Sequence, residues 1–169
     1  MELREIKKFN TNIFSLFDDR WAVLTAGSGD SFNGMTISWG SLGTLWGMPP
    51  RGKPVATVYV RPDRFTFEFL QKSADFTISF FPENLRKIHN VFGRKSGRDT
   101  DKIVAAGIHV RDSSRGVIYE EADLTLVCRR LYASQFDISA IPADIREQFY
   151  GDNNPHYVFI GEIQDIIEK

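Results

Sequence analysis

The run from Asn33 to Trp39 constrains the fold most, because its apolar and polar side chains alternate strictly. Met35, Ile37 and Trp39 alternate with Thr36 and Ser38. This period of two is typical of a strand with one apolar and one polar face. The run 21–26 reads as a buried strand, and the glycine-rich stretch 27–30 as a turn. We therefore predict a hairpin whose second strand spans residues 35–40, with small hydroxyl side chains that leave room for a ligand beside the backbone.

The rest of the chain alternates further short strand patterns with scattered short helical ones. The strands are expected at 55–60, 76–80, 116–133 and 156–167. The helices are expected at 64–71, at 82–91, from a cap at Asp99 to about 106, and at 142–149. Residues 41–54 are rich in Gly and Pro and are expected to form an apolar loop over a site or against a second subunit. This order predicts one domain over residues 1–169, a mainly β (α+β) barrel with short peripheral helices.

Composition excludes several classes of protein. A net charge of −1 over 169 residues argues against a general nucleic-acid binder, which would carry an excess of Lys and Arg. Cys128 is the single cysteine, so no internal disulfide and no paired-cysteine site is possible, and we expect a small buried strand residue. The charged first ten residues lack the apolar core of a secretion signal, and no apolar run approaches the roughly 20 residues of a membrane span. We expect a cytoplasmic protein that does not bind membranes.

Positive charge gathers in two stretches. Residues 51–64 carry a local charge of +3, and residues 86–102 carry +4. Two such stretches in a near-neutral chain suit an anionic ligand such as a phosphate, although two solvated loops would give the same pattern. In the first stretch, Arg61, Arg64 and Thr66 surround the start of the helix expected after Pro62, where free backbone N–H groups favour an anion.

The sequence holds no self-sufficient catalytic set. His89, His109 and His156 lack metal-ligand spacing, so we predict no metal site. The glycine pair at 27 and 29 lacks the third glycine and the helix of a dinucleotide fingerprint, and the run 93–96 lacks the spacing of a phosphate-binding loop. An enzyme with this sequence would depend on a cofactor for its chemistry.

Taken together, five segments resemble the flavin reductase-like family of FMN-binding split β-barrel proteins, especially its flavoredoxin-type branch. They are residues 33–39, 59–66, 76–81, 95–102 and 156–163, in the family's order. The resemblance implies that the isoalloxazine lies along Asn33, Met35, Thr36, Ile37, Ser38 and Trp39. It implies a ribityl phosphate near Arg61, Arg64 and Thr66, and a loop of Lys95, Ser96, Gly97 and Arg98 beside the flavin. Ser79 departs from the pattern, because relatives often carry Asn there.

The resemblance also implies an activity. We expect a homodimeric FMN protein of the flavin reductase class, which takes a hydride from NAD(P)H and passes electrons to free flavin or to an acceptor protein. The alternatives are a flavoredoxin-like electron carrier and a flavin-binding protein without turnover. His156 is the candidate catalytic residue, because the family tends to place a histidine near the flavin; a structural histidine at the start of the last strand is the other reading. The choice between NADH and NADPH, the acceptor, and whether FMN is held tightly stay open.

Overall fold

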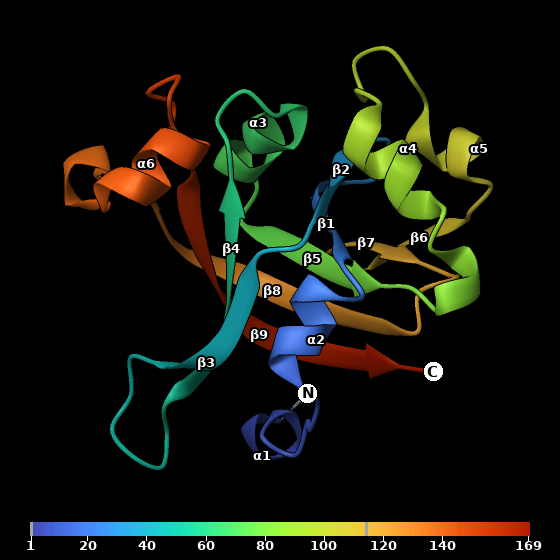
Figure 1. Cartoon of the computed structure of the whole chain (residues 1–169). Coiled ribbons are helices and arrows are strands. Elements are labelled where there is room, and N and C mark those ends of the chain that lie inside the picture. Colours follow the sequence, from blue (N-terminus) through green and yellow to red (C-terminus); the bar gives the residue numbers. More distant parts are fainter. Residues whose placement is uncertain (1, 114) are drawn as a thin grey trace.

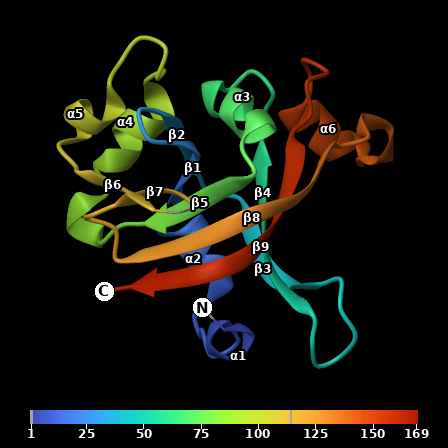
Figure 2. The same ribbon diagram turned by 180° about the vertical axis from the view of Figure 1, so that it is seen from behind.

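The computed structural model describes residues 2–113 and 115–169. Within them, an antiparallel sheet of seven strands in the order β2-β1-β5-β8-β9-β4-β3 wraps around an apolar core (Figures 1 and 2). Its strands are β1 Ala22–Ser28, β2 Ser31–Ile37, β3 Gly40–Leu45, β4 Lys53–Val60, β5 Asp75–Phe80, β8 Leu124–Gln135 and β9 Tyr157–Glu168. A separate hairpin pairs β6 Val110–Ser113 with β7 Gly116–Tyr119. The mainly β class with peripheral helices is confirmed.

The predicted hairpin of β1 and β2 forms, but its second strand starts earlier than expected. Pairing runs from Ala22 opposite Ile37 to Ser28 opposite Ser31, so only two residues turn the chain and β2 begins directly after them. The predicted span of 35–40 was therefore shifted. Met35 and Ile37 pack on the core, as the alternation predicted.

Half of the predicted loop 41–54 is a strand. Gly40–Leu45 pairs residue by residue with Lys53–Val58, and only residues 46–52 connect the two. Glycine lowers strand propensity but does not prevent pairing when the partner strand fixes the register. In Figures 1 and 2 the β3–β4 hairpin extends away from the body of the protein, with Trp46 and Met48 exposed in its connection.

The predicted strand 116–133 is two strands. β7 ends at Tyr119, a turn follows, and β8 begins at Leu124. The break occurs where the Asp123 N–H donates to the Phe80 carbonyl and the Asp123 carboxylate accepts from Arg20 at 2.6 Å. Cys128 lies buried in β8, as expected.

Short helices surround the barrel. They are α1 Leu3–Ile6, α2 Ile13–Asp18, α3 Phe65–Lys72, α4 Ile88–Arg94, α5 Lys102–Ala106 and α6 Ala143–Phe149, with 3-10 turns at Glu83–Leu85 and Ile138–Ala140. The helix predicted at 82–91 is therefore a 3-10 turn followed by α4. The cap of α5 is Asp101, whose carboxylate accepts from the N–H groups of Ile103 and Val104, and not Asp99 as predicted. In both views α6, α3 and α4 line up along one end of the barrel (Figures 1 and 2).

A candidate cofactor-binding groove

A groove crosses the end of the barrel that carries α3, α4 and α6. It consists of two adjoining hollows of about 250 and 170 Å³, which share Met35, Thr36 and Arg64. We call the larger one, between α3, α4 and the loop 95–98, the basic cleft. We call the smaller one, between the end of β2 and His156, the aromatic groove. Each predicted site residue except Gly97 lines one or both hollows.

The basic cleft concentrates positive charge. Five cations line it against one carboxylate, Asp63. The cations are Arg64, Arg94, Lys95, Arg98 and Lys102. Such a wall favours an anion with more than one negative charge. The two basic stretches of the sequence therefore meet in one place instead of forming two separate solvated loops.

Asn33 joins three parts of the cleft. It is buried in β2, and its side-chain N–H donates to the Thr66 hydroxyl in the first turn of α3 at 2.6 Å. A Cβ built on Gly97 would lie 2.0 Å from the Asn33 side-chain oxygen, so the loop 95–98 passes directly over this amide. Gly97 is thus a position of close backbone approach, and Asn33 fixes the floor of the cleft.

The loop 95–98 is held by its own contacts. Arg98 forms an ion pair with Glu68 of α3, and its guanidinium lies 4.5 Å from the Phe65 ring centre. The Ser96 hydroxyl accepts from the Arg98 N–H at 3.2 Å. Arg64 has only a long contact with Asp63, at 3.8 Å, so its charge is available to a ligand.

Lys102 lies beneath the cleft and was not among the predicted site residues. Its ammonium is buried and donates to the carbonyl of Gly34 at 2.8 Å and of Phe92 at 3.4 Å. Burial, together with the charge of Arg64, lowers the pKa of Lys102 to about 8. The lysine is therefore mostly charged at neutral pH. In the sequence, Lys102 stands out only as the last residue of the segment 95–102, one of the five segments that resemble the flavin reductase-like family.

The aromatic groove exposes the end of the first alternating run. Trp39 is 42% exposed, with its ring 5.0 Å from His156 and 5.6 Å from Phe149. It therefore lies outside the core. Ile37 packs its side chain in the core.

The polar groups of this strand end differ in their hydrogen bonding. The Thr36 hydroxyl donates to the His89 carbonyl at 3.3 Å and lies 3.2 Å from Nδ1 of His89. Thr36 is thus tied to α4, while within the described residues no hydrogen bond uses the Ser38 hydroxyl or the Trp39 indole.

The structure places Arg61 and Thr66 in different hollows, and Arg64 lines both. Arg61 lines the aromatic groove, where it forms an ion pair with Asp152, and its Nη1 donates to the Phe149 carbonyl at 3.5 Å. Its Nε is buried and has no hydrogen-bond partner among the described residues. Arg64 and Thr66 line the basic cleft. The three residues of the predicted phosphate seat therefore extend over both hollows, with Arg64 between Arg61 and Thr66.

His156 lies at the wall of the aromatic groove. Its Nδ1 is 2.9 Å from the hydroxyl of the buried Tyr150. Burial, together with the charges of Arg61 and Arg64, lowers the pKa of His156 to about 4. The imidazole is therefore neutral at pH 7, where it can donate or accept a hydrogen bond but cannot act as an acid. Nε2 is the ring nitrogen left for a ligand.

The remaining candidates lie elsewhere. His89 is buried against Trp21 and Phe81, and His109 pairs with Glu121 on the surface. Ser79 is buried in the barrel, with its hydroxyl 3.1 Å from that of Thr125. Over residues 2–113 and 115–169, no cluster of three side chains could hold a metal ion, and no helix is long and apolar enough to cross a membrane.

The groove suits a flat ligand that ends in a phosphate. Three observations support this fit: five cations in the basic cleft, an unpartnered buried N–H of Arg61 in the aromatic groove, and a glycine that admits the loop 95–98 to the cleft floor. An aromatic wall with a few convergent donors is typical of cofactor sites. The residues present therefore fit FMN.

Comparisons with known proteins agree with this geometry. The family model described as "Flavin reductase like domain" matches residues 14–169. A search of curated proteins finds no match. Among solved structures, flavoredoxin from Methanosarcina acetivorans is 21% identical, with a TM-score of 0.68, covering 95% of this chain and 74% of that one.

Two further structures show the same likeness. An FMN-binding protein from Thermus thermophilus with bound 1-cyclohex-2-enone is 24% identical, with a TM-score of 0.65, covering 88% of this chain and 69% of that one. An NADH:FAD oxidoreductase from Streptomyces globisporus is 16% identical, with a TM-score of 0.66, covering 88% and 74%. At these identities the likeness supports a shared fold.

Proposed function

Since the chain belongs to the flavin reductase-like family, we propose that it binds FMN in the groove and reduces it with NADH or NADPH. One observation carries the proposal: the basic cleft and the aromatic groove share Met35, Thr36 and Arg64, which makes them one continuous site. Bound FMN would supply the redox chemistry, accepting at N5 the hydride that leaves C4 of the nicotinamide.

The side chains of the groove bind and orient. Arg64 and the first turn of α3 at Thr66 bind the phosphate. Lys95, Ser96 and Arg98 of the loop 95–98 contact it from the opposite side of the cleft. Ser38 and the Trp39 indole offer donors to the polar edge of the ring, and Met35 offers an apolar contact to its face. These groups fix the reacting atoms relative to each other, which is the main contribution a protein makes to such a transfer.

His156 is proposed to orient the nicotinamide. The neutral imidazole that follows from its lowered pKa can hydrogen-bond the nicotinamide amide without placing a charge near it. A proton donated by the Tyr150 hydroxyl to Nδ1 would leave the single imidazole proton on Nε2 and make His156 a donor toward the groove. Tyr150 is then a positioning residue that selects the tautomer.

A flavoredoxin-like electron carrier is the second candidate. It is favoured by the exposed edge formed by Trp39 and Phe149, 42% and 40% exposed, beside the groove. An acceptor protein could approach the flavin along this edge. A carrier would keep FMN bound but would turn over reduced nicotinamide negligibly.

We also propose a homodimer in the cytoplasm. The β3–β4 hairpin exposes Trp46 and Met48 and leaves one edge of β3 unpaired within the sheet, which suits an apolar interface between copies. A single cysteine, buried in β8, fits a reducing compartment.

The experiment is steady-state oxidation of NADH and of NADPH by the purified protein, followed at 340 nm with and without added FMN. A flavin reductase oxidises one or both in proportion to its FMN content. Bound FMN without oxidation of NADH or NADPH would contradict the flavin reductase and support the flavoredoxin-like electron carrier. Neither bound FMN nor oxidation would contradict both.

A further inference from the structure

Lys102 carries a buried charge that takes no part in the function proposed above. Its side chain is 8% exposed, and its Nζ donates to the carbonyls of Gly34 and Phe92 at 2.8 and 3.4 Å. Within residues 2–113 and 115–169, no carboxylate forms an ion pair with this ammonium. A buried charge is costly unless an opposite charge lies close to it. The position therefore favours an anion that the described chain does not provide.

The two carbonyls that accept from Lys102 belong to the walls of the groove. Gly34 lies in β2, an edge strand whose partner in the sheet is β1. Phe92 lies in the last turn of α4, where carbonyls lack helical partners and the helix dipole favours a cation. A Cβ built on Gly34 would lie 2.9 Å from a ring carbon of Phe92, so strand and helix are in close contact here. Lys102 thus joins β2 to α4 between Asn33, at the floor of the basic cleft, and Met35, which lines both hollows.

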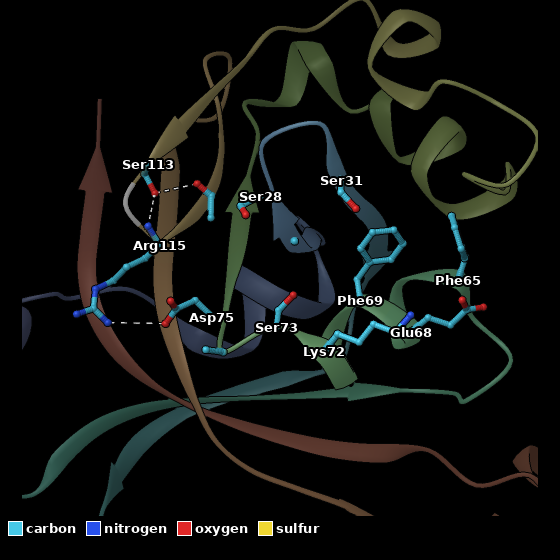
Figure 3. Close-up of a pocket in the computed structure, with 13 residues that line it drawn as sticks. Ser28, Ser31, Phe65, Glu68, Phe69, Lys72, Ser73, Asp75, Ser113 and Arg115 are labelled. Atoms are coloured by element: carbon cyan, nitrogen blue, oxygen red, sulfur yellow. Dashed lines mark hydrogen bonds and ion pairs between the residues drawn. The ribbon is translucent and has the colours of Figure 1, made fainter.

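The basic cleft is the place where an anion can offset this charge. Its lining holds five cations, Lys102 among them, against one carboxylate. The largest cavity, of about 720 Å³ beside α3, differs in this respect, because Glu68 and Asp75 balance Lys72 and Arg115 in its lining (Figure 3). Arg115 and Asp75 pair there at 3.7 Å, as Figure 3 shows. A phosphate monoester, with a charge of about −1.5 to −2, suits the cleft and not the cavity.

The charges that face Lys102 come from the elements packed around it. In the cleft they are Arg64, Arg94, Lys95, Arg98 and Asp63, and in an adjoining hollow of about 380 Å³, which Lys102 also lines, they are Asp30 and Asp101. Asp101 is engaged as the cap of α5. Burial, together with the charge of Arg64, lowers the pKa of Lys102 to about 8. An anion bound in the cleft opposes both causes and raises this pKa.

We propose that Lys102 supplies buried positive charge to the phosphate site of FMN, and that FMN binding in mildly alkaline solution takes up a proton at this residue. Lys102 is a positioning residue, which acts through its charge and through the Gly34 carbonyl. The flavin-free protein releases the proton near pH 8, whereas the FMN-bound protein retains it. The affinity for FMN therefore falls as the pH rises through 8. This inference rests on the proposed binding of FMN and adds its control by pH.

The first test measures the affinities for FMN and for riboflavin by flavin fluorescence at pH 7 and at pH 9. A pKa that rises on binding from about 8 to 9 or above makes FMN binding about five- to tenfold weaker at pH 9. Riboflavin lacks the phosphate and experiences the other effects of pH, so its affinity should change less than twofold. An equal ratio of the two affinities at pH 7 and pH 9 would overturn the proposal and leave the binding of FMN intact.

The second test counts the protons by calorimetry at pH 8.5 in two buffers that differ in ionisation enthalpy. The wild type should take up about half a proton or more per FMN. Lys102→Met should lose this uptake and bind FMN at least fivefold more weakly at pH 7, while its riboflavin affinity shows that the groove still forms. Lys87→Met, at an exposed lysine before α4 outside the cleft, should behave as the wild type. Uptake that persists in Lys102→Met would overturn the proposal.

A third measurement separates this proposal from the proposed function. No binding of FMN at any pH would contradict the proposed function, and inorganic phosphate would then judge Lys102 alone. In the flavin-free protein with ¹³C-labelled lysine, saturating phosphate should raise the titration midpoint of Lys102 by at least about half a pH unit and leave that of Lys87 in place. A Lys102 midpoint that phosphate does not move would overturn the proposal.

Discussion

Replacing Gly97 with Ala tests whether Asn33 and the loop 95–98 form one unit. A Cβ at this position would lie 2.0 Å from the Asn33 side-chain oxygen, 3.0 Å from its Cγ and 3.2 Å from a Phe65 ring carbon. Gly97 does not lie in the left-handed region, so the backbone itself accepts alanine. The substitution must therefore move either the loop or the buried amide.

The magnitude follows from those two outcomes. Forcing extra atoms into a packed site costs about 1–3 kcal/mol. If the amide moves instead, its 2.6 Å hydrogen bond to Thr66 is lost, and a buried polar group left unpaired costs a similar amount, about 1–3 kcal/mol. We therefore expect Gly97→Ala to lower the free energy of unfolding by about 1–3 kcal/mol and to weaken FMN binding.

Asn33→Ala provides the internal control. It removes the amide that the new methyl group would meet, so Gly97→Ala should cost less than about 0.5 kcal/mol in that background. Urea denaturation of the wild type, both single variants and the double variant measures the four free energies. Gly93→Ala is the matched control, because its Cβ would meet only Thr36 at 3.5 Å, and within α4 it should stabilise by about 0.5–1 kcal/mol. An equal cost of Gly97→Ala in both backgrounds would refute the close contact.

Four further predictions follow from the groove and the fold. Arg64→Ala should weaken FMN binding by roughly 1.5–3 kcal/mol and riboflavin binding much less, as fluorescence titration will measure, because only FMN carries the phosphate; equal losses would place Arg64 away from it. His156→Ala should keep FMN and slow flavin reduction by about 10- to 100-fold in stopped-flow at 450 nm, and an unchanged rate would return the residue to a structural role. Burial lowers the pKa of His89 from 6.5 to about 4, so the unfolded chain binds more protons between these values; unfolding free energy should fall as the pH drops from about 6.5 to about 4, and His89→Gln should reduce this dependence to the part that His156, with the same lowered pKa, contributes. Light scattering should give twice 19.3 kDa at micromolar concentration, and Met48→Glu in the β3–β4 hairpin should shift it toward 19.3 kDa; a monomeric wild type would contradict the dimer.

Much of the fold was predictable, because alternation reports directly which face of a strand is buried. The runs in β1, β2 and β5 carry such patterns, and α3 shows its aromatic pair at the helical spacing of 65 and 69. The strand β3 was missed because glycine at 40 and 43 weakens the local signal, whereas pairing with β4 decides the structure. That information lies in the partner strand and not in the segment itself.

The sequence predicted which segments form the site, but not how their side chains are arranged in it. Arg61 and Arg64 are close in sequence, and the Arg64 N–H donates to the Arg61 carbonyl in a turn, but only Arg64 reaches the basic cleft as well as the aromatic groove. Arg61 meets Asp152, 91 residues away. Lys102 lies under the cleft only because α5 packs there, with its ammonium on the Gly34 carbonyl. Contacts between distant segments therefore decide which cations face the ligand.

The central claim is that the groove holds a flavin by its phosphate. The most direct measurement is equilibrium titration of the flavin-free protein with FMN and with riboflavin, followed by flavin fluorescence. We predict one FMN per chain, bound at least 100-fold more tightly than riboflavin, with the difference shrinking at high salt because the cations of the cleft are screened. Equal affinity for the two flavins, or no binding of FMN, would contradict the account.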